Sequence, residues 1–300
     1  MLHIKVPATS ANMGPGFDSI GVALQLYNHL WVEEIPNGLA IEIKREQGIA
    51  ISRDENNLIY QTMAAFYAEL GKQMPAVHLI QEDFIPMVRG LGSSAACIVA
   101  GLLAANALSG ANYSVEHLAQ IAAKMEGHPD NSNPALMGGM VVGVLNQEKM
   151  GYVKVDMPED LIFAAMVPDF PVSTTKSRGV LPQQISREDA IFNASRAGLL
   201  VASMYTRKYE NLAMAMEDKM HQPYRKQLIP DMDGIFQTAK ESGALATYLS
   251  GAGSTLMAVL KEDIADEFET KMTRYLSSIP NGWKLTLLKP DITGAQIIAE

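Results

Sequence analysis

The stretch VRGLGSSAACIVAGLLAAN, residues 88–106, has the residue types of a phosphate-binding turn. Gly90 and Gly92 precede Ser93 and Ser94, and an alanine-rich apolar segment follows them like the first turns of a helix. Glycines let backbone N–H groups approach an anion, and a helix start adds unpaired donors and a positive dipole end. The chain has neither a P-loop nor G-x-G-x-x-G after a strand. A nucleotide bound here would depend on backbone donors rather than on a lysine.

Two further loops are dense in small and polar residues. The first is KVPATSANMGPGFDSIG at residues 5–21, and the second is YLSGAGSTLMAV at residues 248–259, which we expect between a helix and a strand. Each segment also has an interpretation without a ligand, as an elaborate turn, and in the 88–106 stretch the serines could be ordinary N-caps. One segment alone does not decide between these interpretations.

Composition narrows the classes of protein. Three hundred residues suggest two domains of about 150 residues. A formal charge of -9 argues against a nucleic-acid surface, which needs a basic stripe. The single cysteine, Cys97, excludes an internal disulfide and lies in an apolar run, so we expect it to be buried. No segment has the pattern of a signal peptide or a membrane span, so we expect a cytoplasmic protein without membrane contacts.

Periodicity predicts interleaved strands and helices. We expect strands at residues 2–6, 22–35, 39–46, 76–84, 138–145, 161–167, 255–260 and near the end, and helices at 53–72, 93–108, 114–125, 188–218, 230–242 and 262–276. The pattern loosens at residues 146–160, which is the best domain boundary.

The three loops resemble, in order and approximate spacing, the three signature motifs of the GHMP small-molecule kinase superfamily. The resemblance covers essentially the whole chain. Five segments resemble the homoserine kinase family in particular: PATSANMGPGFDSIGVAL, PMVRGLGSSAA, GHPDN, STTKSRGVLP and HQPYRKQLIP. The implied fold is α+β, a two-domain GHMP kinase fold. It has a ribosomal protein S5 domain 2-like N-terminal domain, residues 1–155, a ferredoxin-like C-terminal domain, residues 156–300, and an active site between them.

The resemblance implies ATP and Mg²⁺ as cofactors. The residues it places on the nucleotide are Pro86, Arg89, Gly90, Leu91, Gly92, Ser93, Ser94, Ala95, Ala96, Gly251 and Gly253. Magnesium maps onto Ser94 and Glu126, with Glu116 as a remote alternative to the glutamate.

The implied reaction transfers the γ-phosphate of ATP to the side-chain hydroxyl of L-homoserine, giving O-phospho-L-homoserine for threonine biosynthesis. A zwitterionic acceptor needs a cation for its carboxylate and an anion for its ammonium, which Arg178, Arg225 and Asp18 can supply. The resemblance places the substrate-binding residues at Asn12, Asp18, His128, Asn131, Arg178 and Arg225, and the catalytic residues at Asn131, Thr174 and Arg178. Phosphoryl transfer depends mainly on positioning and charge neutralisation, so a strong base is optional and the role of Asp130 stays open.

Alternatives remain at this point. The arginines could be solvated surface residues, His128 a turn residue and Asp18 a cap. Mevalonate kinase-like and diphosphomevalonate decarboxylase-like enzymes act on acceptors without an ammonium, which Asp18 would not favour. A non-catalytic GHMP-fold sensor is the rival from another class, against which the intact glycines and Ser94 argue. Whether the chain forms a homodimer is open.

Overall fold

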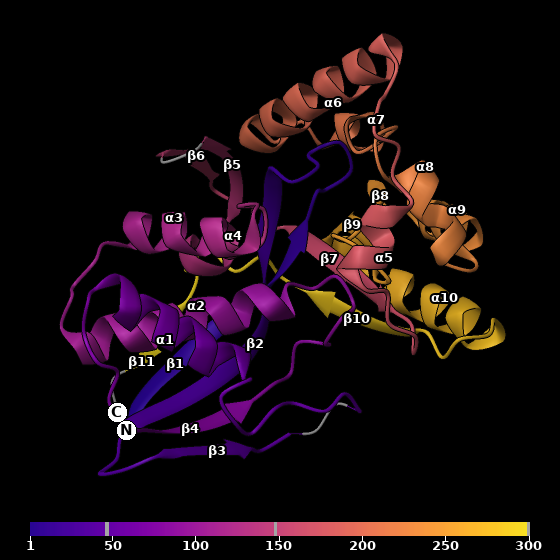
Figure 1. The fold of residues 1–300 in the computed structure, drawn as a ribbon. Helices are drawn as coiled ribbons and strands as arrows, with labels where there is room; N and C mark the ends of the chain where they lie inside the picture. Colours follow the sequence, from indigo (N-terminus) through magenta and orange to yellow (C-terminus); the bar gives the residue numbers. More distant parts are fainter. Residues whose placement is uncertain (46–47, 147–148, 299–300) are drawn as a thin grey trace.

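The computed structural model describes residues 1–45, 48–146 and 149–298 as two β-sheets with helices packed on them (Figure 1). The first sheet has seven strands: β1 (Leu2–Ala11), β2 (Ile20–Glu34), β3 (Leu39–Ile43), β4 (Val77–Glu82), β5 (Met140–Asn146), β6 (Lys149–Val155) and β11 (Gln296–Ile298). Its order is β11-β1-β2-β4-β3, and β5 pairs with the start of β2 and with β6. Among the strand pairs of the described residues in this sheet, β3 with β4 is parallel and the others are antiparallel.

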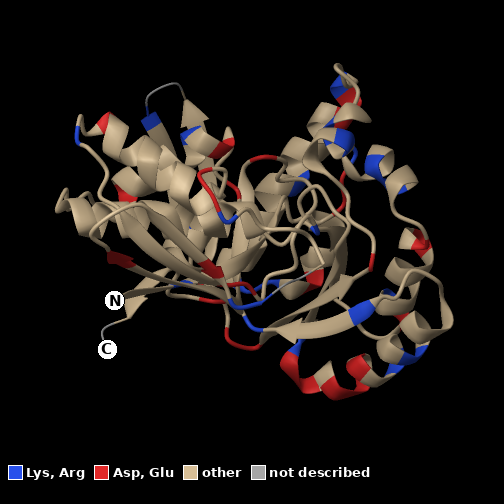
Figure 2. Ribbon diagram, turned by 60° about the horizontal axis from the view of Figure 1, so that its bottom comes forward, with Lys and Arg blue, Asp and Glu red and all other residues tan. Residues whose placement is uncertain are grey.

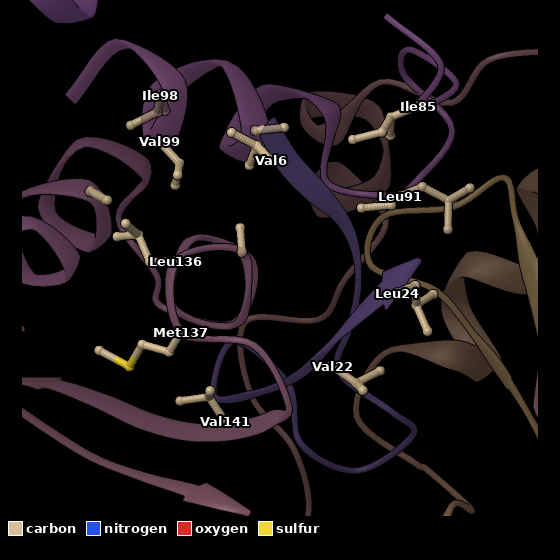
Figure 3. Packing of buried hydrophobic residues seen from close by; sticks show 14 of the residues in the cluster. Val6, Val22, Leu24, Ile85, Leu91, Ile98, Val99, Leu136, Met137 and Val141 are labelled. Carbon is tan, nitrogen blue, oxygen red and sulfur yellow. The ribbon is translucent and has the colours of Figure 1, made fainter. Parts of the chain in front are cut away.

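Four helices pack on one face of this sheet: α1 (Leu58–Glu69), α2 (Ser93–Ser109), α3 (Val115–Glu126) and α4 (Ser132–Met137). Figure 3 shows Ile98 and Val99 of α2 in the core that they share with Val6 of β1. Asn57 and Ser114 cap α1 and α3 through their side chains, whereas Gly92 caps α2 with no side-chain hydrogen bond. The first N–H groups of α2 are therefore left to another acceptor.

The second sheet has the order β10-β7-β9-β8, and all its pairs are antiparallel. Its strands are β7 (Leu161–Val167), β8 (Ala246–Leu249), β9 (Leu256–Lys261) and β10 (Lys284–Leu288). One face packs on α9 (Met232–Glu241) and α10 (Ala265–Ser278). Both faces of β7 are buried, because Phe163 belongs to one core cluster and its neighbours Ile162 and Ala164 belong to the other. This explains its unbroken apolar run.

The remaining helices follow β7: α5 (Thr174–Gly179), α6 (Arg187–Thr206), α7 (Leu212–Ala215) and α8 (Gln222–Arg225). Short 3₁₀ turns lie at Tyr209–Asn211, Lys226–Leu228 and Glu262–Ile264. Buried residues of α6 and α7, such as Leu200 and Leu212, join the core cluster that also fills the first sheet. One of the two core clusters thus reaches both sheets, and the other lies between the second sheet and the helices α9 and α10.

The predicted division into residues 1–155 and 156–300 stays a prediction. The chain passes from the first sheet to the second between Val155 and Leu161, but β11 returns to pair with β1. Residue 46 of one expected strand and residues 147–148 of the expected boundary lie outside the described residues.

Two expectations about elements are wrong. The helix expected at 188–218 ends at Thr206, because Arg207 adopts a left-handed conformation with φ of 59°. The segment at 146–160, where the pattern loosens, also contains β6, a strand that the sequence analysis did not include. The third glycine loop joins two strands, β8 and β9, where we expected a helix before it. The four residues of β8 are too few to show a clear alternation.

The described helices include none that is both long and apolar enough to cross a membrane. Lysines and arginines are interleaved with acidic residues over both parts of the ribbon in Figure 2. This mixture agrees with an acidic chain that lacks a basic stripe.

Three loops meet where the two sheets adjoin. We call them loop 1 (residues 12–19), loop 2 (residues 83–92) and loop 3 (residues 250–255). The Ser250 hydroxyl of loop 3 bonds the Ser10 hydroxyl at 2.8 Å and donates to the Gly90 carbonyl at 2.5 Å. Asn12 donates through Nδ2 to the Gly251 carbonyl at 3.1 Å. Segments 160 to 240 residues apart in sequence therefore form one junction.

Gly90 tests this junction. Its φ is 79°, and a Cβ there would lie 2.3 Å from the Ser250 carbonyl oxygen. Gly90→Ala should therefore lower the free energy of unfolding by about 2 kcal/mol or more, since it adds a clash to backbone strain. Gly110→Ala is the matched control, because Gly110 has φ of 67° with nothing within 4 Å of its Cβ position. Urea denaturation of both variants measures the difference. Equal losses would show that the loop contact contributes nothing beyond backbone strain.

Candidate active site

A cavity of about 640 Å³ lies at the loop junction. Fifteen of the residues predicted from the sequence line it: Asn12, Asp18, Gly90, Gly92, Ser93, Ser94, Ala95, Glu126, His128, Asn131, Thr174, Arg178, Arg225, Gly251 and Gly253. They come from all three loops, from α2, from the α3–α4 connection and from α5 and α8. Both halves of the chain thus contribute to one site.

The turn that opens α2 is shaped for close approach to a ligand. Gly92 has φ of 70°, and a Cβ there would lie 2.0 Å from Oγ1 of Thr9. Ser93 is the first helical residue rather than the cap, so the interpretation of these serines as N-caps is wrong for α2. The helix start therefore presents backbone donors and its positive dipole end to the cavity.

Four residues predicted on the nucleotide do not line the cavity. Leu91 and Ala96 are buried in the core, as Figure 3 shows for Leu91. Arg89 turns towards the second sheet and donates from Nε to the Pro168 carbonyl at 3.0 Å and from Nη2 to the Asp169 carbonyl at 2.6 Å. Burial lowers the pKa of Arg89, with Asp169 acting against the shift. Together with Pro86, these residues shape loop 2 and tie it to its neighbours.

Glu126, at the end of α3, is the best oxygen donor for a metal. Its Oε2 atom is buried and has no hydrogen-bond partner among the described residues. Burial raises the pKa of Glu126 to about 7; His128 acts against this shift, and the charge of Asp130 adds to it. Ser94 lines the same cavity, and magnesium takes hard oxygen ligands of this kind. The residues present therefore fit a divalent cation.

At the acceptor end, Arg178 and Asp18 form a two-pronged ion pair. The Nη1–Oδ2 distance is 3.0 Å and the Nη2–Oδ1 distance is 2.8 Å. The pair joins loop 1 to α5, and both side chains are about one-third exposed. The sequence predicted that these two residues would bind opposite ends of a ligand, whereas in the structure they bind each other.

Arg225 lies beside this pair and is almost fully buried. Burial, and then the charge of Arg178, lower the pKa of Arg225 to about 10, so it stays protonated at neutral pH. The Phe17 ring lies 5.1 Å from the guanidinium carbon of Arg225 and 5.5 Å from that of Arg178. This ring, which the sequence did not single out, partly offsets the repulsion between the two cations.

His128, Asp130 and Asn131 also line the cavity, and ligand atoms of His128 and Asp130 lie within 4.8 Å of a carboxylate oxygen of Asp18. His128 Nδ1 and Asp130 Oδ1 are 2.5 Å apart, and Asn131 Oδ1 accepts from the Thr9 hydroxyl at 2.9 Å. Burial lowers the pKa of His128, but Asp130, Glu126 and Asp18 outweigh it and leave this pKa above its ordinary value. His128 is therefore better suited to donate a hydrogen bond than to act as a base.

The cavity is also lined by three linked polar residues that the sequence analysis missed, Asn57, Gln81 and Asp83, which we place at the end away from the acceptor residues. Asn57 donates to the Gln81 side chain at 3.2 Å, and Gln81 donates to Asp83 at 2.6 Å. Burial raises the pKa of Asp83 to about 6. Ile51 and Leu58 give this end an apolar wall. In the sequence, Asn57 stands where a helix N-cap is expected, but no local pattern indicated that Asn57, Gln81 and Asp83 line a ligand site.

Cys97 also borders this end of the cavity. Burial and then the charge of Asp83 raise the pKa of its thiol. The thiol thus stays protonated, as expected for a packing residue.

Comparisons with known proteins agree with this geometry. Two family models match the chain: the GHMP kinases N terminal domain over residues 57–139 and the GHMP kinases C terminal model over residues 200–278. The chain belongs to the GHMP kinase family. The predicted family and the two-domain α+β fold are confirmed.

Full-length relatives narrow this class. The homoserine kinase of Caldicellulosiruptor saccharolyticus is 45% identical over 301 residues, covering 100% of this chain and 97% of the relative. The homoserine kinase of Clostridium acetobutylicum is 46% identical over 99% of this chain and all of the relative. The crystal structure of homoserine kinase from Cytophaga hutchinsonii matches with a TM-score of 0.89 at 27% identity, covering 99% of this chain and 97% of that one. Within the GHMP kinases, the chain therefore groups with the homoserine kinase family.

Because the Glu126 carboxyl is buried, we expect its replacement by a neutral amide to stabilise the folded protein. Its folded pKa of about 7 exceeds the ordinary 4.5, so the unfolded chain ionises first and burial becomes increasingly costly up to pH 7. Glu126→Gln should raise the Tm of the metal-free protein at pH 8 by several degrees, and the gain should vanish below pH 4.5. Calorimetry at pH 4 and pH 8 measures it. Glu116→Gln is the control, because Glu116 is solvent-exposed. No gain at pH 8 would contradict a buried, unpaired carboxyl at Glu126.

Proposed function

We propose that this protein transfers the γ-phosphate of ATP to the side-chain hydroxyl of L-homoserine, giving O-phospho-L-homoserine for threonine biosynthesis. The observation that carries the proposal is the pairing of Asp18 with Arg178 inside a cavity that also holds the α2 start. In an acceptor with both an ammonium and a carboxylate, the ammonium can take the place of Arg178 beside Asp18, and the carboxylate can take the place of Asp18 beside Arg178. Homoserine is such an acceptor and also carries the hydroxyl.

The nucleotide would lie along loop 2 with its phosphates at the start of α2. Ser93, Ser94 and Ala95 line the cavity there, and the backbone N–H groups at the helix start would bind the phosphate oxygens. The base would occupy the end lined by Ile51 and Leu58, where Gln81 and Asp83 offer acceptors to an adenine amino group. This explains how a chain without a P-loop lysine binds ATP.

Magnesium would be held by Ser94 and Glu126. When bound, the ion supplies positive charge to the phosphate oxygens as charge shifts during transfer. Glu126 must be ionised to bind it, so metal binding releases a proton near neutral pH. The cost of keeping this carboxyl buried without a partner would then be offset by the metal.

The remaining residues position the acceptor. Arg225 and Arg178 bind the carboxylate, Asp18 binds the ammonium, and His128 with Asn12 and Asn131 surrounds the hydroxyl. Asp130 is engaged with His128, whose raised pKa makes it a donor rather than a base. Catalysis then comes from alignment and charge neutralisation, with Thr174 of α5 and Asn131 holding the reacting oxygens in line.

An assay of ADP release across several acceptors tests this function. Purified protein with ATP should release ADP with L-homoserine, should require Mg²⁺, and should show little activity with mevalonate, shikimate or galactose. Activity restricted to mevalonate would favour the mevalonate kinase-like alternative. No activity with any acceptor, despite ATP binding, would favour a sensor.

Asp18 predicts how the enzyme selects its acceptor. We expect wild-type kcat/KM to be much higher for L-homoserine than for 4-hydroxybutyrate, which lacks the amine. The latter must break the Asp18–Arg178 pair and leave Asp18 unpaired in a partly desolvated site. Asp18→Asn removes that cost and the ammonium partner together, so the preference should narrow by about tenfold or more.

The KM for ATP at saturating homoserine is the control and should not change. Equal losses for both acceptors would mean that Asp18 shapes loop 1 without contacting the ammonium. A wild type without preference would argue against homoserine itself.

A further inference from the structure

His221, the residue before α8, is fully buried and is not explained by the proposed contacts of substrate or nucleotide. Its Nε2 atom lies 2.8 Å from the Gly14 carbonyl oxygen of loop 1. Its Nδ1 atom lies 3.3 Å from Nη1 of Arg225, one helical turn further along the chain. The imidazole of His221 thus bridges loop 1 and Arg225.

The two partners determine which ring nitrogen carries the proton. A carbonyl oxygen only accepts, so Nε2 must donate to Gly14. A guanidinium only donates, so Nδ1 must accept from Arg225. His221 is therefore neutral and protonated at Nε2. Burial lowers the pKa of His221 to about 4, which agrees with this state around neutral pH.

The segment that carries His221 is held rigidly. Buried Asp218 accepts from the backbone N–H groups of His221 at 2.8 Å and Gln222 at 2.7 Å. It also accepts from the Asn193 side chain of α6 at 2.6 Å. Loop 1 meets the same region from the other side, because a Cβ on Gly14 would lie 2.2 Å from the Met216 carbonyl oxygen. The ring has little freedom to move away from either partner.

Three acceptors set the plane of the Arg225 guanidinium. Besides His221, they are the Ser177 carbonyl, 3.3 Å from Nε, and the Gly251 carbonyl, 2.9 Å from Nη1. Nη2 has no hydrogen-bond partner within the described part of the chain, and Arg225 lines the cavity. Of the three acceptors, only His221 is a side chain. It links Arg225 to Gly14 of loop 1, and the Gly251 carbonyl makes a second link because it also accepts from Asn12 of loop 1.

We propose that His221 is a positioning residue for the acceptor carboxylate: as a neutral Nε2–H imidazole it fixes Arg225 relative to loop 1, so that Nη2 points at the ligand. The proposal rests on the proposed function, since it needs an acceptor with a carboxylate. It adds a residue that does not touch the substrate and acts through Arg225. His221 thereby couples Arg225 to loop 1, the loop that carries Asp18.

Two substitutions separate the two hydrogen bonds. His221→Asn places an amide oxygen near the position of Nδ1 and keeps an acceptor for Arg225. His221→Gln reaches the position of Nε2 and keeps a donor for Gly14, but leaves Arg225 without this acceptor. We expect His221→Gln to raise the KM for L-homoserine by about tenfold or more, and His221→Asn to raise it much less. In both variants the KM for ATP should stay close to that of the wild type.

A double-mutant cycle shows whether the effect passes through Arg225. In an Arg225→Leu background, His221→Gln should have little further effect on kcat/KM for homoserine, because the group it orients is gone. Additive losses, or equal increases in the KM values for ATP and homoserine, would overturn the positioning role. A larger effect of Asn than of Gln would overturn it as well. A wild type that does not phosphorylate homoserine would instead overturn the proposed function, and the carboxylate role of His221 with it.

Discussion

The hydroxyl of Ser250 joins the three segments on which the site depends. It is fully buried, and its two hydrogen bonds reach β1 through Ser10 and loop 2 through Gly90. Backbones approach so closely here that a Cβ on Gly90 would lie 2.3 Å from the Ser250 carbonyl oxygen. The small residues of the three loops are therefore a packing requirement first. The same packing leaves N–H groups and a helix start exposed to the cavity, so junction and phosphate site are one structure.

Charge in the cavity is arranged locally, in a chain whose net charge is -9. Arg178, Arg225 and His128 face Asp18, Asp130 and Glu126 over short distances, so a ligand meets alternating signs. The Phe17 ring lies close to both Arg178 and Arg225, and burial shifts the pKa values of Arg225 and Glu126 towards neutrality. A zwitterion matches such a pattern better than a simple anion does.

The sequence predicted much of this arrangement, because glycine and serine patterns report local backbone needs directly. Loop 2, the start of α2 and the residue types at Asp18 and Arg225 follow from such patterns and from the family resemblance. The pairing of Asp18 with Arg178, 160 residues apart, does not, since no local pattern encodes which distant charges meet. Arg89 shows the converse, because its place in a motif suggested a ligand contact while its side chain binds carbonyl groups across the junction. His221 and Phe17 were missed because their roles exist only after loop 1 has folded against α8.

The return of β11 to β1 affects how the molecule can be made. His3 and Ile4 pair with Ile298 and Ile297, so one edge of the first sheet stays open until residues 296–298 have left the ribosome. The N-terminal strand thus waits through the synthesis of the entire second sheet before its last neighbour arrives. A first half that folds early has an incomplete sheet with an unpaired edge at β1. This edge is covered only after residue 298 has been synthesised. The first strand of the chain, β1, therefore has as its neighbour the last strand to be synthesised, β11.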